Sequence, residues 1–82
     1  MEYVGEQVSV VASFGGKERV RPVKFRWAHR VVQITEVTYR WTDRQGQSKV
    51  YHFCVTDGST IYELSFNATS IVWKLDKVET NT

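Results

Sequence analysis

Apolar side chains recur at every second position along most of this chain, and turn-forming residues interrupt the alternation at short intervals. A period of two places successive side chains on opposite faces of a β-strand. Nowhere do apolar residues keep the i, i+3, i+4, i+7 spacing of an amphipathic helix over a useful length. The pattern therefore predicts no substantial helix and six strands, at about residues 7–14, 20–28, 31–42, 48–56, 60–66 and 71–78.

The turn signals indicate which residues lie opposite each other. Asp57-Gly58 is typical of a type I′ hairpin turn and places Phe53 opposite Tyr62. Turns at His29-Arg30, Asp43 to Gln47 and Asn67 to Ser70 add the pairs Phe25 with Ile34, Tyr39 with Tyr51, and Leu64 with Trp73. A slip of one residue would send every side chain to the wrong face, so this agreement favours an antiparallel meander.

One face of the predicted sheet is apolar throughout. Its residues are Val8, Val10, Val23, Phe25, Trp27, Val32, Ile34, Val37, Tyr39, Trp41, Tyr51, Phe53, Tyr62, Leu64, Phe66, Ile71, Trp73 and Leu75. No helix is expected to cover this face, and water does not tolerate so large an apolar patch. The sequence therefore predicts an all-β fold, a six-stranded antiparallel meander curled into a small barrel or half-barrel. Inward residues change from even to odd numbers near Thr35-Glu36, which indicates a β-bulge and a bend.

The 82 residues are enough for a single small β domain spanning 1–82, with an ordered core at about 7–78. We expect the polar tail, 79–82, to fray. The chain has one cysteine, Cys54, so no internal disulfide can form, which is typical of a reducing cytoplasm. It begins without the basic flank and apolar run of a signal peptide, and no apolar run approaches the roughly 18 residues of a membrane helix. We therefore expect a cytoplasmic protein without membrane contact.

The motif Pro-x-x-Phe-x-Trp-x-x-Arg begins at Pro22, and a later hairpin contains Asp57-Gly58 and Trp73. Together these features resemble a family of small bacterial domains of unknown function, over about residues 19–79. The family often has glycine where this chain has His29, and tyrosine near the position of Val32. The resemblance implies a small β domain and carries no reaction or ligand with it.

Positive charge is concentrated in one part of the chain. Residues 17–30 hold six of the 11 Lys and Arg residues but one of the nine Asp and Glu residues. Such asymmetry favours an anionic partner, either nucleic acid or an acidic protein surface. The candidate binding residues are Arg21, Lys24, Arg26, Arg30 and Arg40. The simpler interpretation is that cations keep the solvent face polar and protect strand edges.

Aromatic rings decide how strong a nucleic-acid site would be, because bases stack on exposed rings. The predicted faces place Phe25, Trp27, Tyr39 and Trp41 inside the fold. Trp41 and Tyr3, which lie near strand ends, are the best candidates for partly exposed rings. Basic residues without exposed rings predict weak binding that depends on salt.

Two other function classes remain open. A protein-interaction module or homodimer would use sheet edges, or an outward apolar patch of Val11, Val50, Ile61 and Val72. A thiol enzyme would use Cys54 with His52 and Glu63, predicted on one outward face with His52 opposite Glu63 and Glu63 opposite Lys74. No pocket or oxyanion hole is apparent, and no metal-ligand or cofactor spacing occurs. The sequence therefore predicts a non-catalytic binding module with no cofactor or metal.

Overall fold

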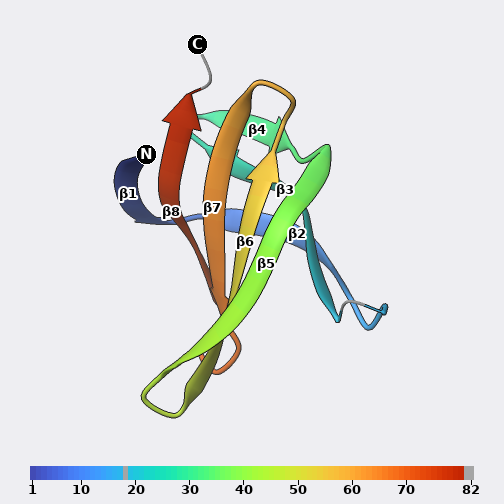
Figure 1. Cartoon of the computed structure of the whole chain (residues 1–82), viewed down its shortest axis with the longest axis vertical. Helices are drawn as coiled ribbons and strands as arrows, with labels where there is room; N and C mark the ends of the chain where they lie inside the picture. The colour runs from blue at the N-terminus through green and yellow to red at the C-terminus, as the bar shows by residue number, and fades with distance from the viewer. Residues whose placement is uncertain (18, 81–82) are drawn as a thin grey trace.

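The computed structural model describes residues 1–17 and 19–80, which form eight β-strands and no helix (Figure 1). The strands are β1 (Glu2–Gln7), β2 (Ser9–Phe14), β3 (Val20–Trp27), β4 (Arg30–Gln33), β5 (Glu36–Gln45), β6 (Ser48–Thr56), β7 (Thr60–Asn67) and β8 (Val72–Thr80). The all-β, antiparallel prediction is confirmed. The described residues form eight strands instead of the six predicted, and these make two sheets that do not close into a barrel.

The two sheets are joined where long strands bend. One sheet has five strands in the order β1-β8-β7-β6-β5, and the other has three in the order β2-β3-β4. The chain passes from one sheet to the other at Val8 and again at Ile34-Thr35. The chain does bend near Thr35-Glu36, where β4 ends and β5 begins, but the bulge lies between Val37 and Tyr39 and turns Tyr39 and Trp41 outward instead of inward. The chain therefore changes its pairing partner at each crossing. Before and after Val8, β1 pairs with β8 and β2 with β3; before and after Ile34-Thr35, β4 pairs with β3 and β5 with β6.

Both ends of the described chain are more regular than the sequence indicated. The first strand, β1, pairs with β8 along the edge of the larger sheet. Its side chains are mostly exposed, so it lacks the alternation that marks a buried strand. Glu79 and Thr80 belong to β8 and lie opposite Ile61 and Thr60 of β7, whereas the rest of the predicted tail lies outside the described residues.

The core lies between the two sheets. The smaller sheet contributes Val20, Pro22, Phe25 and Val32, and the larger sheet contributes Phe53, Val55, Tyr62, Leu64, Phe66, Trp73 and Leu75. Phe25 of β3 meets Tyr62 of β7 edge to face, with ring centroids 5.1 Å apart. Aromatic rings therefore supply much of the apolar area that holds this small domain together.

One residue of β3 is bulged, and this changes two predicted positions. Val11 pairs with Lys24 and Ala12 pairs with Pro22, which leaves Val23 unpaired between them. Val23 was predicted to face the core and is instead exposed, while Pro22 is buried. The proline fits beside a bulge because it has no backbone N–H to donate to the ladder.

Predicted strand pairs differ from the observed ones in two ways. Phe53 lies opposite Leu64 instead of Tyr62, a shift of two that leaves each side chain on its predicted face. Ile71 was predicted to lie on the apolar face, but it lies in the turn before β8 and is 67% exposed.

The pairing register between β5 and β6 differs from the predicted register by an odd number of residues, which exchanges the two faces of β5. The loop predicted from Asp43 to Gln47 is a tight turn at Gly46-Gln47, since Gln45 pairs with Ser48. Tyr39 lies opposite Cys54 and Trp41 opposite His52, so both rings face away from the core. The polar residues that suggested a loop belong to a hairpin that extends beyond the rest of the sheet (Figure 1).

Candidate functional site

Strand β3 carries three of the predicted binding residues on the outward face of the smaller sheet. Val20, Pro22 and Phe25 point inward, so Arg21, Lys24 and Arg26 point outward. Lys24 and Arg26 are two residues apart on the strand, which separates their Cα atoms by about 7 Å. We call the outward surface of β2, β3 and β4 the basic face.

The neighbours of these cations on the basic face are neutral. Lys24 lies opposite Val11 and Gln33, and Arg26 lies opposite Ser9 and Val31. A groove of about 280 Å³ runs here, lined by Ser9, Val10, Val11, Lys24, Phe25, Arg26 and Val31. Val11, Val23 and Val31 are between 40 and 53% exposed. The outward positions of β2, β3 and β4 hold no carboxylate, so their positive charge is not neutralised within the face.

The turn between β2 and β3 extends the basic face. Gly15 donates its N–H to the carbonyl of Arg19, and Arg19 donates to the carbonyl of Gly16. Lys17, Arg19 and Arg21 line a small hollow of about 200 Å³. Lys17 and Arg19 were not among the predicted binding residues, although they belong to the same basic segment.

The other two predicted binding residues lie elsewhere. Arg30 Nη2 donates to the hydroxyl of Tyr62 at 3.4 Å. Arg40 Nη1 donates to the carbonyl of Val20 at 3.2 Å, and its guanidinium lies 5.3 Å from the centroid of the Phe53 ring. Both side chains therefore border the core between the sheets, and the structure does not bring them together with Lys24 and Arg26.

Tyr62 and Asp57 form a polar network at the same end of the core as Arg30. The Tyr62 hydroxyl donates to Asp57 Oδ2 at 3.2 Å. Backbone N–H groups of Ser59 and Thr60 donate to Asp57 Oδ1, and these bonds lower the pKa of the Asp57 carboxyl. Burial, with the Asp57 charge, raises the pKa of Tyr62. The network fixes the turn between β6 and β7.

Of the four aromatic rings predicted to lie inside the fold, two face the core and two lie on the outward face of the larger sheet. Phe25 is buried and Trp27 is partly buried, with its indole N–H donating to Glu6 at 3.2 Å, so the prediction that they face inward is confirmed. Tyr39 and Trp41, predicted inside, lie outward on β5. Trp41 stacks on His52 with centroids 4.8 Å apart. Phe14 of β2 is 59% exposed, but it lies opposite the inward Val20 and packs edge to face on Phe66. The outward positions of the basic face therefore hold no aromatic ring.

The predicted outward pairs around His52 are different in the structure. His52 Nε2 lies 3.1 Å from Asp43 Oδ1, and Glu63 lies opposite Cys54 with its carboxylate 3.9 Å from Lys77 Nζ. Burial and the Glu63 charge raise the pKa of the Cys54 thiol. A raised pKa disfavours the thiolate, which is the reactive form of cysteine.

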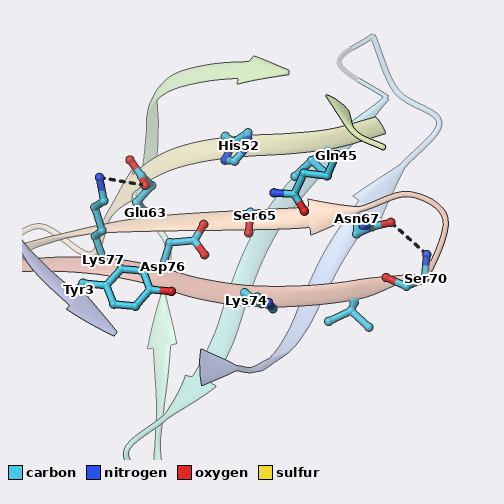
Figure 2. Close-up of a pocket in the computed structure, with 12 residues that line it drawn as sticks. Tyr3, Gln45, His52, Glu63, Ser65, Asn67, Ser70, Lys74, Asp76 and Lys77 are labelled. Atoms are coloured by element: carbon cyan, nitrogen blue, oxygen red, sulfur yellow. Dashed lines mark hydrogen bonds and ion pairs between the residues drawn. The ribbon is translucent and has the colours of Figure 1, made fainter. Parts of the chain in front are cut away.

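The predicted outward apolar patch does not form. Val50 is only 2% exposed, and Val11 lies on the other sheet from Val50, Ile61 and Val72. Val50 and Val72 instead line a hollow of about 550 Å³ on the outward face of the larger sheet (Figure 2). We call it the outer hollow. Sequence reasoning missed it because its side chains come from all five strands of that sheet.

Within the described residues, no group of three or more His, Cys, Asp or Glu side chains is placed to hold a metal ion. That part of the chain also has no helix long and apolar enough to cross a membrane. Comparison of the chain with protein-family models, with curated proteins and with solved structures finds no match.

Proposed function

We propose that this chain is a non-catalytic binding module that holds single-stranded nucleic acid weakly against its basic face. The observation that supports this most is the outward row of Arg21, Lys24 and Arg26 on a sheet face without a carboxylate. The backbone of a nucleic acid is a regular array of negative charges, and cations spaced along a strand can follow it. Cytoplasmic location belongs to the same proposal, since a reducing compartment keeps the Cys54 thiol free.

The affinity of such a face is set by charge alone. For single strands, each neutralised phosphate adds about −0.7 to the slope of log K against log salt concentration, so three contacts give about −2. Stacking would add about 1–3 kcal/mol per base, but no ring of this face is available for it. We therefore expect a dissociation constant in the range of about 1–100 μM at low salt, with little preference for base sequence.

A second candidate function is binding of an acidic protein segment. Val11, Val23 and Val31 are exposed between the cations, and this mixture suits a partner that offers carboxylates together with apolar side chains. Replacing Val11 and Val31 with serine separates the two functions. The substitutions should weaken a protein partner and leave oligonucleotide binding unchanged, because phosphates make no use of the valine side chains.

The test is a fluorescence-anisotropy titration with labelled oligothymidylate and with a duplex, at about 50 and about 200 mM salt. The double variant K24E/R26E should lose binding while its circular dichroism spectrum stays that of the wild type. The matched control is R44E/K49E, which changes the charge equally at exposed positions of the β5–β6 hairpin. A dissociation constant above about 100 μM at low salt, or an equal loss in the control, would contradict the proposal.

A further inference from the structure

We propose that the outer hollow is a second binding site, separate from the basic face, and that its ligand is a neutral saccharide. The hollow of about 550 Å³ is within the range of roughly 300–1,000 Å³ that small-molecule sites occupy. It is formed by side chains from β1, β5, β6, β7 and β8, all on the face of the larger sheet that points away from the core (Figure 2).

An aromatic ring lies at one side of the outer hollow. Tyr3 is 76% exposed, although its ring lies close against the backbone of Gly5. A Cβ built at Gly5 would be 2.6 Å from the Tyr3 hydroxyl oxygen and 2.8 Å from the ring carbon that bears it. The missing side chain at Gly5 is therefore what lets the ring lie there, backed by the strand and open to solvent. Such a supported ring offers a flat apolar surface to a ligand.

Polar groups of several hydrogen-bonding kinds line the hollow from the ring to its far end (Figure 2). The hollow is lined by the carboxylates of Glu63 and Asp76, the amides of Gln45 and Asn67, and the hydroxyls of Ser65 and Ser70. Amides and hydroxyls both donate and accept, and carboxylates accept. A ligand with many hydroxyl groups can bond to donors and acceptors of these kinds.

The charges of the hollow cancel, which selects against charged ligands. Its two carboxylates are matched by Lys74 and Lys77, and the Lys77 ammonium lies 3.9 Å from the Glu63 carboxylate. A phosphate would be repelled by Glu63 and Asp76, and an organic cation by the two lysines. An apolar ligand would cover polar groups without replacing their hydrogen bonds to water. A neutral molecule with hydroxyls and one apolar side remains, and this describes a saccharide.

The experiment is a ¹H–¹⁵N NMR titration of the full chain with maltose, cellobiose, lactose and N,N′-diacetylchitobiose, each to about 10 mM. At least one of the four should produce saturable shifts in the amide signals of Tyr3, Ser65 and Lys74, and no shifts at Lys24 or Arg26. Inorganic phosphate, titrated in the same way, should not shift the first group. If no disaccharide gives saturable shifts there, or if phosphate does, the proposal is wrong.

Substitutions of Tyr3 test whether its ring contributes to saccharide binding. Tyr3→Ala should weaken saccharide binding about tenfold, and Tyr3→Phe should bind as the wild type does, since the flat ring is kept. Tyr39→Ala is the matched control, because Tyr39 is a similarly exposed tyrosine of the same sheet, at 64%, that does not line the hollow. An equal loss in Tyr39→Ala would contradict the role given to Tyr3. Oligonucleotide binding tests the basic face separately, so either site can fail alone.

Discussion

Ile71 holds a backbone conformation that its own side chain opposes, and replacing it with glycine should stabilise the protein. Its φ is 60°, in the left-handed region that β-branched residues rarely enter. The turn before β8 imposes this conformation: the Ile71 N–H donates to the carbonyl of Asn67, and the Asn67 side chain accepts from Thr69 and Ser70. Glycine adopts the same φ without a steric penalty.

The expected change in the free energy of unfolding is the relief of backbone strain at Ile71 minus two costs. Relief of the backbone strain is worth about 1–3 kcal/mol. The side chain is 67% exposed, so removing it costs about a third of the roughly 1.5–3 kcal/mol of a fully buried isoleucine. The extra freedom of glycine in the unfolded chain costs about 0.5–1 kcal/mol. The net gain expected for Ile71→Gly is therefore about 0.5 kcal/mol.

Urea unfolding, followed by tryptophan fluorescence, measures this gain as a midpoint higher by roughly 0.5 M, for a slope of about 1 kcal/mol per molar. Ala68→Gly, in the same turn, is the matched control. Ala68 is exposed and its φ is not positive, so glycine there should cost about 0.5–1 kcal/mol. If both variants lose stability alike, the Ile71 side chain contributes more than its strain, and the reasoning is refuted.

Three further predictions concern residues whose roles the structure reassigns or defines. Arg40→Ala should lower the free energy of unfolding by about 1–3 kcal/mol through lost contact with Phe53 and a lost hydrogen bond, yet leave oligonucleotide affinity unchanged; a variant with weaker affinity and full stability would return Arg40 to the binding site. The pKa of Asp57 is lower in the folded protein than in the unfolded chain, so the ionised carboxyl stabilises the fold above about pH 4, and this stabilisation is lost as pH falls through the folded pKa. The difference in free energy of unfolding between the wild type and Asp57→Asn, measured by urea unfolding, should therefore shrink from pH 7 to pH 3. Cys54 should react with iodoacetamide more slowly than a free cysteine at pH 8, since burial and Glu63 raise its pKa; faster reaction would revive the thiol-enzyme alternative.

Much of the core was predictable because the side-chain period of a strand is two. Phe53 was paired with Tyr62 and lies opposite Leu64, but an error of two residues keeps both on the inward face. Turn signals such as Asp57-Gly58 located the hairpins well enough for this purpose. The inward row of the larger sheet from Phe53 to Leu75 was therefore identified without knowing its exact register.

The faces of β5 could not be predicted in the same way. Its hairpin with β6 runs past the core, so polar residues there mark an exposed strand and not a loop. Reading Asp43 to Gln47 as a loop shifted the register by an odd number, which turned Tyr39 and Trp41 inward. The bulge at Val23 likewise depends on how β2 and β3 meet, and no local signal in the sequence encodes it.

The candidate sites show the same contrast. Arg21, Lys24 and Arg26 share one strand, so alternation alone places them together. Arg30 and Arg40 were grouped with them by charge, but the chain directs both to the border of the core. The outer hollow gathers residues from five strands, and only the assembled sheet brings them together.

The most direct test of the basic face is NMR mapping of the surface that contacts oligothymidylate at low salt. The account predicts amide shifts at Lys24 and Arg26 on β3, and at Val11 and Val31 on the adjacent strands, with an affinity about 16-fold lower at about 200 mM salt than at about 50 mM. Shifts gathered instead around the exposed Tyr39 on the larger sheet, or an affinity that does not change with salt, would contradict it.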